Sequence, residues 1–439
     1  MDLGIFAVFM LVAIIVAVML GVPVSFSMGG FSLLFGLVFL GEGFIRLFPA
    51  TTFGMMTAYP FVAVPLFIFM GAMLERAGIA DKLYGSLYLS LGPLKGGLAI
   101  ATVLMATLFG ACTGVVGAGV ITIGLLALPS MLSRGYGKGF ASGAVLVGGG
   151  LGVIIPPSVM LIFYGATGGV SIGALFIAGI VPGILLASLD IAYIVVRALI
   201  HPWVGPAISK QERDKYSWGQ LALMILTSLV PPLFLILAVL GTIFFGVAAP
   251  SEAGGMGALG ATIVAAAYGK LTWKNIKESA LITLRISSMV LFIAWAGKLF
   301  CAVFLSMGAM ELVKRFLLGL PFGPTGILLV MLFIIFIMGC VMDWVGMIFI
   351  LVPIFAPIVK ALGIDPLYFG MLFCVTLQVS NMTPPFAYSV FYLKGIAPPE
   401  VSIMDMYIGS IPYFLTDLLA VIIMILFPNI ILWLPSLRF

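Results

Sequence analysis

The chain has 439 residues, of which 63% are hydrophobic and 8% are charged, and its formal net charge is +5. Soluble domains carry about 25% charged residues, so this chain has too few charges to cover a water-facing surface. The composition predicts a polytopic membrane protein with room for about a dozen helices of about 20 residues each. Continuous apolar runs such as 221–240 exclude a transmembrane β-barrel, whose strands alternate apolar and polar residues. Lys and Arg are scattered singly, which indicates a bilayer and no nucleic-acid partner.

The first unusual segment along the chain is 97–130, which has basic residues on both sides. It is too short for two full spans of about 20 residues each, and its centre reads Gly-Ala-Cys-Thr-Gly from Gly110 to Gly114. We interpret it as a re-entrant hairpin that enters and leaves the membrane on the cytoplasmic side. Non-helical backbone at that depth needs surrounding protein or a cavity. Two short tilted spans are the alternative.

The next span, 139–165, contains four glycines that end at Gly152, followed by Val-Ile-Ile and then Pro156, Pro157 and Ser158. Proline lacks an N–H and blocks the preceding helical turn, so we expect a helix that is broken within the membrane. Carbonyl and hydroxyl oxygens freed there suit a small cation, and the start of the second half-helix suits a carboxylate. The alternative is an ordinary proline kink in a packed helix.

The most polar stretch, 201–219, divides the chain almost in half, and its basic residues predict a cytoplasmic linker. In the second half, 324–359 is a second candidate hairpin and 366–393 is a second candidate broken helix. The other apolar runs predict uninterrupted spans at about 3–20, 22–41, 60–77, 172–200, 220–245, 250–269, 279–313 and 402–432.

The two halves of the chain repeat one another. The offset from Pro156 to Pro384 equals the offset from Phe163 to Phe391. Three further pairs follow: Gly110 with Gly339 and Pro182 with Pro412 at nearly the same offset, and Gly71 with Gly308 at a larger one, so the spacing drifts there. Each half has five spans, an odd number, so the second half is expected to be inverted in the membrane. Inverted repeats with broken helices are typical of secondary transporters.

Polar groups gather before the second proline pair and at the second hairpin tip. Five of them lie within eight residues at membrane depth: Thr376, Gln378, Ser380, Asn381 and Thr383. Such groups are costly unless they are paired or line a wet cavity. We interpret them as the wall of a site, with hydrogen bonding between helices as the alternative. At the hairpin tip, Asp343 is expected either to bind a cation or to cap the helix that begins near Trp344.

Signatures of enzymes and of ATP-driven transport are missing. The chain has one histidine and therefore no HExxH motif, and it has no Walker A motif. An intramembrane enzyme that used Asp343 or Asp190 would need two carboxylates brought together, and no single motif contains such a pair. We expect no enzyme activity.

The chain resembles the large membrane subunit of the tripartite ATP-independent periplasmic (TRAP) transporters over essentially its whole length. The resemblance rests on five runs: Phe109-Gly-Ala-Cys-Thr-Gly-Val-Val-Gly-Ala, Leu128-Pro-Ser-Met-Leu-Ser-Arg-Gly-Tyr, Ile154-Ile-Pro-Pro-Ser, Ala248-Ala-Pro-Ser-Glu-Ala and Leu377-Gln-Val-Ser-Asn-Met-Thr-Pro-Pro-Phe. Many members have Ser-Gly-Ser-Ser where this chain has Thr-Gly-Val-Val from Thr113, and glycine in place of Ala387. The chain looks closest to the branch associated with mannitol, chloroaromatic and 2-oxo acids.

The resemblance implies an all-α, inverted-repeat elevator with two re-entrant hairpins and two broken helices in the bacterial inner membrane. It implies sodium-driven import of a small organic acid, together with a small four-helix membrane subunit and a periplasmic substrate-binding protein. A stand-alone sodium/carboxylate symporter is the alternative. The implied units are scaffold helices 1–80, a first transport half 81–200, the linker 201–219, scaffold helices 220–320 and a second transport half 321–439.

The resemblance also implies the site residues. Sodium ligands are expected at Thr113, Gly114, Gly152, Pro156, Gly339, Asp343, Ser380 and Thr383. Substrate contacts are expected at Thr113, Pro157, Ser158, Thr383 and Pro385.

Overall fold

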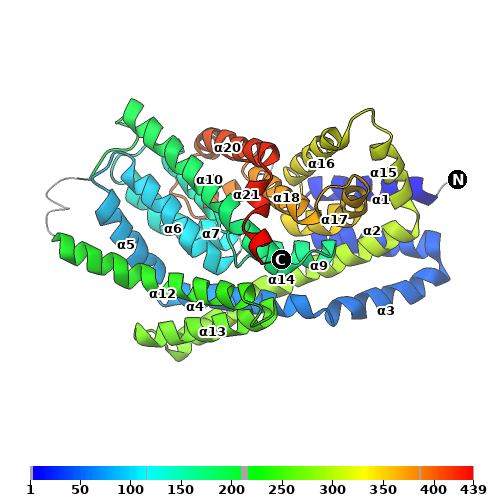
Figure 1. Cartoon of the computed structure of the whole chain (residues 1–439), viewed down its shortest axis with the longest axis horizontal. Coiled ribbons are helices and arrows are strands. Elements are labelled where there is room, and N and C mark those ends of the chain that lie inside the picture. Colours follow the sequence, from blue (N-terminus) through cyan, green and yellow to red (C-terminus); the bar gives the residue numbers. More distant parts are fainter. Residues whose placement is uncertain (1–2, 115, 209–215, 385–386, 439) are drawn as a thin grey trace.

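The computed structural model describes residues 3–114, 116–208, 216–384 and 387–438 (Figure 1). Helices make up most of these ranges, which contain no β-strand. In the first half the elements are α1 (Leu3–Met19), α2 (Val24–Phe35), η1 (Gly36–Leu40), α3 (Glu42–Met56), η2 (Tyr59–Val62), α4 (Ala63–Arg76), α5 (Ile79–Leu91), α6 (Gly97–Thr113), α7 (Val116–Leu132), α8 (Lys138–Leu151), α9 (Val159–Gly168) and α10 (Ile172–Ile200). In the second half they are α12 (Trp218–Phe244), α13 (Pro250–Ala267), α14 (Trp273–Ser306), α15 (Ala309–Leu318), α16 (Pro324–Gly339), α17 (Trp344–Ala361), α18 (Pro366–Ser380), α19 (Tyr388–Lys394), α20 (Ile403–Leu426), α21 (Asn429–Leu432) and η3 (Pro435–Leu437).

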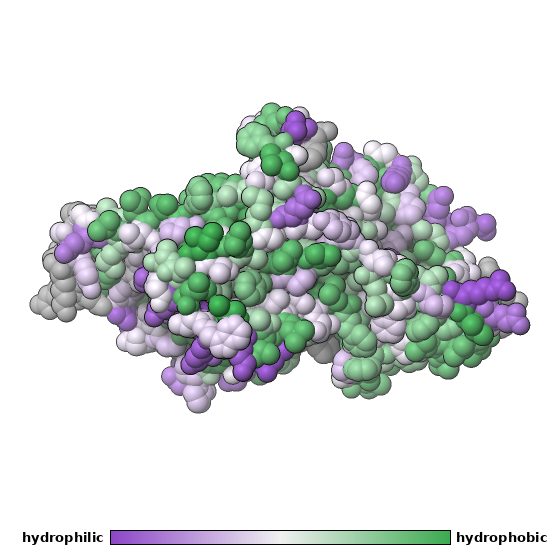
Figure 2. Space-filling model, turned by 90° about the horizontal axis from the view of Figure 1, so that it is seen from below, coloured by the Kyte–Doolittle hydropathy of each residue, from purple (hydrophilic) through white to green (hydrophobic). Residues whose placement is uncertain are grey.

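Apolar helices of membrane-spanning length confirm the prediction of an all-helical, multi-pass chain. Within the described residues, six helices are long and apolar enough to cross a bilayer: Tyr59–Arg76, Ile172–Ile200, Gly219–Phe244, Trp273–Ser306, Trp344–Ala361 and Ile403–Leu426. The face seen in Figure 2 is covered mostly by hydrophobic residues, with hydrophilic residues mainly toward its margins. A bilayer provides the apolar surroundings that such a surface needs.

Three helices, α3, α5 and α15, were not expected from the sequence. The predicted span 279–313 begins and ends too late, because α14 runs from Trp273 to Ser306 and the chain turns at Gly308, whose φ of 80° is left-handed. In α15, Glu311 and Arg315 form an exposed ion pair at 3.2 Å along one side of the helix. Charged residues at helical spacing therefore make α15 a surface helix and not the end of a span.

One landmark of the internal repeat is wrong. Gly71 lies inside α4 and is buried, whereas Gly308 is the left-handed glycine between α14 and α15. The residue in the matching position is Gly78, which is left-handed and lies between α4 and α5. The offset from Gly78 to Gly308 equals that from Pro182 to Pro412, which removes the drift that the Gly71 pairing introduced.

Several helices outside the two hairpins and breaks pack against one another. Helix α4 packs against α13 and α14, α14 also contacts α2 and α3, and α12 contacts α5 and α13. In Figure 1, α12, α13, α4 and α3 run along the lower edge. The hairpin pair α6 and α7 lies to the left of the central α9 and α18, and the hairpin pair α16 and α17 lies to their right (Figure 1).

The start of the predicted linker, 201–219, is attached to loops of the first half. The amide of Gly96 donates to the carbonyl of Gly205 at 2.8 Å, and the amide of Ile208 donates to the carbonyl of Gly92 at 2.9 Å. The middle of the linker lies outside the described residues. These bonds bring the basic loops of the first half to one end of the molecule, as a shared cytoplasmic location requires.

Candidate functional site

The tip of the first hairpin lies against the break between α8 and α9. Helices α6 and α7 are joined at Gly114, which adopts a left-handed φ of 62°. A β-carbon on Gly114 would lie 3.4 Å from the carbonyl oxygen of Pro157 and 3.2 Å from the amide nitrogen of Val159. One turn earlier, a β-carbon on Gly110 would lie 2.5 Å from the α-carbon of Gly152. Glycine at these positions therefore permits direct contact between the two backbones.

The second hairpin has the same relation to the break between α18 and α19. Its first helix, α16, ends at Gly339, and a β-carbon there would lie 2.1 Å from Oγ of Ser380, the last residue of α18. Gly339 is the counterpart of Gly110 in the repeat. Ser380 is the counterpart of Gly152, because the two pairs have nearly the same offset along the chain. In both halves, a hairpin tip therefore closes on the residues where a helix is interrupted.

Within the first break, the peptide bond between Pro156 and Pro157 is cis, and Ser158 caps α9. The Ser158 hydroxyl donates to the carbonyl of Val153 and accepts from the amide of Leu161 at 3.4 Å. The side chain is fully buried. In this conformation its hydrogen bonds join the two half-helices, and its contact with a substrate stays a prediction.

Asp343 caps α17, as one of the two sequence interpretations expected. Its Oδ2 accepts a hydrogen bond from the amide of Val345 at 3.1 Å. A carboxylate at a helix N-terminus satisfies a free amide and interacts favourably with the helix dipole. Capping occupies one oxygen only, so cation binding by the other remains a prediction.

The two hairpins, the second break and α14 enclose a cavity of about 30 Å³. Its lining residues are Val116, Gly117, Met289, Val290, Asp343, Trp344, Val345, Asn381, Tyr388 and Tyr392. Asp343 is the one charged residue in that lining, and its charge acts on the phenols of Tyr388 and Tyr392. A cavity of this size holds a single water or ion and no organic acid.

The polar row before the second proline pair is divided between several environments. Asn381 lines the cavity, whereas Gln378 is fully buried against Gly150, where a β-carbon would lie 1.6 Å from Nε2 of Gln378. The hydroxyls of Ser380 and Thr383 donate to carbonyls of their own helix end, at 2.7 and 2.9 Å. Thr376 lines a separate apolar groove between α16, α18 and α20.

Some expected site residues cannot be assigned, and others were missed. The side chain of Thr113 and all of Pro385 lie outside the described part of the chain. Sequence reasoning missed the approach of Gly117 to Tyr392, where a β-carbon on the glycine would lie 3.1 Å from Cζ of the ring. The Phe-Tyr pair containing Tyr392 was used only as a repeat landmark. Nothing in the sequence marks Met289 of α14 as a residue of the cavity, because apolar residues are common in membrane-spanning helices.

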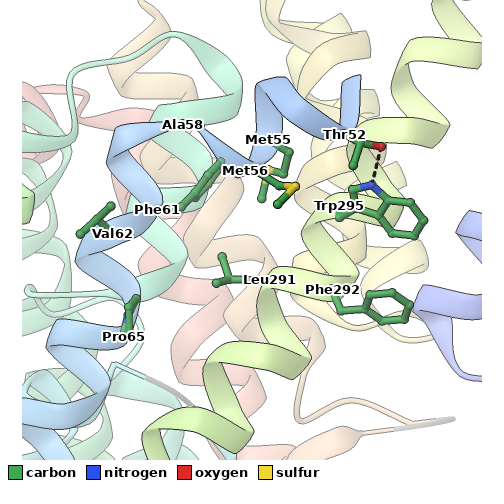
Figure 3. A pocket seen from close by; sticks show the side chains of 10 residues that line it. All are labelled: Thr52, Met55, Met56, Ala58, Phe61, Val62, Pro65, Leu291, Phe292 and Trp295. Atoms are coloured by element: carbon green, nitrogen blue, oxygen red, sulfur yellow. Dashed lines mark hydrogen bonds between the residues drawn. The ribbon is translucent and has the colours of Figure 1, made fainter. Parts of the chain in front are cut away.

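A larger cavity, of about 550 Å³, lies between α3, η2 and α14 (Figure 3). Methionine, aromatic and aliphatic side chains surround it, and the indole of Trp295 donates to the Thr52 hydroxyl at 3.0 Å. This lining has no charged residue. It therefore offers no charged group to bind an anionic solute.

A Gly-x-Ser-x-Gly run occurs from Gly169 to Gly173, around Ser171. In hydrolases this pattern places a serine on a turn from a strand to a helix. Here it joins two helices, and Ser171 caps α10 by accepting from the amide of Ala174 at 3.3 Å. The run is a capping turn and not a nucleophile elbow.

Comparison with known proteins gives a match along most of the chain. The family model described as the DctM component of the tripartite ATP-independent periplasmic transporters matches residues 11–430. A C4-dicarboxylate TRAP transporter large permease protein from Vibrio cholerae is 28% identical, over 98% of each chain. An ectoine/5-hydroxyectoine TRAP transporter large permease protein from Ruegeria pomeroyi is 32% identical, over 86% of each chain. The crystal structure of the Alcanivorax borkumensis YdaH transporter has the same fold, with a TM-score of 0.63 over 97% of this chain and 98% of that chain at 17% identity.

Proposed function

Because the chain belongs to the DctM family of the tripartite ATP-independent periplasmic transporters, we propose that it imports a small organic acid across the bacterial inner membrane, coupled to sodium. The observation that carries this proposal is the closure of two hairpin tips on two helix breaks, with a cavity between the hairpins and the second break whose lining has a single carboxylate. Such breaks supply the oxygens and helix ends that bind ions and substrates in secondary transporters.

The first proposed sodium site combines Thr113, Gly114, Gly152 and Pro156. The contact of Gly110 with Gly152 and of Gly114 with Pro157 brings the backbone of the tip beside the break. The last carbonyls of a helix have no partner within that helix, and their oxygens are hard ligands that suit a sodium ion.

The second proposed sodium site combines Gly339, Asp343, Ser380 and Thr383. Ser380 and Thr383 use their hydroxyl protons in bonds to carbonyls, which leaves oxygen lone pairs for a cation. Asp343 adds a negative charge, which would balance a bound sodium ion. Occupation of this site would join the second tip to the second break.

A substrate carboxylate would bind where the tips meet the breaks, near Thr113, Pro157, Ser158, Thr383 and Pro385. The N-terminus of α9, which begins directly after Ser158, favours a negative charge there. The cavity of about 30 Å³ must widen to admit an organic acid. We propose that a tip opens for this step, and that the two transport halves then move as an elevator against the scaffold helices.

We propose an organic acid as the solute. The resemblance favours the branch of the family that is associated with mannitol, chloroaromatic acids and 2-oxo acids. The related permeases named for C4-dicarboxylates and ectoine make those solutes the necessary comparison. The partners in this proposal are a small four-helix membrane subunit and a periplasmic binding protein that delivers the solute. A stand-alone symporter would need neither.

The test is uptake by proteoliposomes that contain this chain with both proposed partners. The panel of radiolabelled solutes contains 2-oxo acids, chloroaromatic acids, mannitol, C4-dicarboxylates and ectoine, each with an inward sodium gradient. Uptake that needs both sodium and the binding protein supports the tripartite importer and identifies the solute. Uptake that persists without the binding protein favours the symporter. Uptake driven by a proton gradient alone contradicts the sodium sites.

A further inference from the structure

Helices α10 and α20 end the two halves of the chain and pack against one another. Each has one buried acidic residue, Asp190 in α10 and Asp417 in α20. Their separation along the chain nearly equals that of the two proline breaks, so they occupy corresponding positions in the repeat. Asp190 is 0% exposed and Asp417 is 1% exposed. The fold thus buries two corresponding carboxyl groups at one contact between the halves.

These carboxyl groups have few hydrogen bonds. The Thr416 hydroxyl donates to Oδ1 of Asp190 at 2.7 Å. Oδ2 of Asp190 and both oxygens of Asp417 are buried without a hydrogen-bond partner among the described residues. Thr416 directly precedes Asp417 in α20, so its bond to Asp190 places the two carboxyl groups at neighbouring positions of the contact between α10 and α20.

Tyr413 is a separate indication of a missing partner at this site. Its side chain is fully buried, its ring packs edge-on against Tyr193, and its hydroxyl is likewise unpaired among the described residues. A buried hydroxyl normally has a hydrogen-bond partner. Tyr413 therefore presents a further unpartnered polar atom at the contact between α10 and α20.

No basic side chain neutralises the pair within the described ranges. Arg197, on α10, contacts His201 at 3.2 Å at the end of that helix. Helices α6, α9 and α12, and the short elements α21 and η3, have no charged residue. The remaining described titratable groups on the packed helices are Lys138 of α8, bonded to the carbonyl of Glu400, Lys394 of α19, bonded to the carbonyl of Val401, and the side chains of Tyr164, Tyr193, Tyr368, Cys374, Tyr388, Tyr392, Asp405 and Tyr407.

We propose that Asp190 and Asp417 form a proton-binding site, in which one proton is shared between the two carboxyl groups. Two adjacent carboxylates in an apolar interior cannot both remain ionised, and one shared proton removes a charge and supplies the missing hydrogen bond. Thr416 orients Asp190 in this arrangement.

Infrared spectroscopy of the full-length protein in lipid nanodiscs at pH 7 tests the proposal. An ordinary aspartate, with a pKa of about 3.9, gives no carboxylic-acid carbonyl band at that pH. We expect such a band in the wild-type protein and its loss in the Asp190→Asn, Asp417→Asn double variant. The matched control is Asp405→Asn, on the same helix as Asp417, where the exposed carboxylate bonds to Ser402 and the band should persist.

Three results would contradict the proposal that Asp190 and Asp417 share a proton. The first is a wild-type spectrum without the band, and the second is a band that the double variant retains. The third is a band that appears only when choline replaces sodium, because a sodium ion would then occupy the pair. If the double variant does not fold, Thr416→Val replaces it. That change removes the hydrogen bond to Asp190, so it should shift the frequency of the band, and an unshifted band would assign it to another residue.

Discussion

Gly110 and Gly152 approach each other so closely that neither position has room for a side chain. A β-carbon on Gly152 would lie 2.4 Å from the α-carbon of Gly110 and 2.7 Å from its carbonyl carbon. The opposing atoms belong to the backbone, so they cannot rotate away as the end of a flexible side chain can. This contact attaches the first hairpin to the first helix break.

Gly152→Ala should therefore separate the hairpin from the break. Overpacking of this kind costs about 1–3 kcal/mol, and we expect a lower unfolding temperature together with loss of sodium-dependent uptake. Gly255→Ala is the matched control, because Gly255 lies in α13 with open space around its β-carbon position. Normal uptake by Gly152→Ala would show that this contact does not position the proposed sodium ligands.

The two roles of Asp343 can be separated by the choice of substitution. Asparagine retains a capping oxygen but has no charge, whereas alanine has neither, and loss of a cap costs about 1 kcal/mol. We expect Asp343→Asn to keep its thermal stability and to need at least about tenfold more sodium for half-maximal uptake, which corresponds to about 1.4 kcal/mol. Asp343→Ala should lose both stability and sodium affinity. An unchanged sodium dependence in both variants would contradict cation binding by this carboxylate.

Sodium should stabilise the purified protein in the absence of any solute. A ligand that binds only the folded state stabilises it by about 2.7 kcal/mol at one hundred times its dissociation constant. We expect sodium chloride, compared with choline chloride at equal ionic strength, to raise the midpoint of thermal unfolding. The increase should be smaller in Asp343→Asn, because one of the two proposed sites is weakened. Equal midpoints in the two salts would argue against both sites.

Ala387 has a left-handed backbone, with φ of 41°, and is the only described residue other than glycine with a positive φ. This conformation costs an L-residue about 1–2 kcal/mol, whereas glycine adopts it freely. Ala387→Gly should therefore raise the free energy of unfolding by about 0.5 kcal/mol, once the greater chain entropy of glycine is subtracted. Thermal unfolding in one detergent, with Ala361→Gly as a helical control that should destabilise, measures the difference.

Gly117 and Tyr392 connect the first hairpin to the second half across the cavity. A β-carbon on Gly117 would lie 3.1 to 3.3 Å from three atoms of the Tyr392 ring. Gly117→Ala should reduce uptake, and Tyr392→Leu in the same chain should restore part of it, because the smaller side chain makes room. A double-mutant cycle measures this coupling. Strictly additive effects of the two changes would mean that the contact has no role in transport.

Composition and local sequence were sufficient to predict the class of the protein and the two helix breaks. Too few charged residues leave only a bilayer as surroundings. Glycines precede the first proline pair and polar residues precede the second, and these runs marked the ends of α8 and α18, whereas α12 continues through Pro231 and Pro232. The five runs that carry the resemblance together predicted the family, which the match over residues 11–430 confirmed. These features depend on neighbouring residues or on totals over the chain.

The tertiary structure decided which distant residues meet. Asp190 and Asp417 belong to no common motif, and only the packing of α10 on α20 makes them a pair. The approach of Gly117 to Tyr392, and the apolar wall that α14 adds to the cavity, likewise depend on packing between helices. Even Gly78 was recognised as the counterpart of Gly308 only from its backbone conformation. One apolar helix surface can pack against many similar surfaces with nearly equal energy. The pattern of apolar residues along one helix therefore does not specify which other helix it packs against.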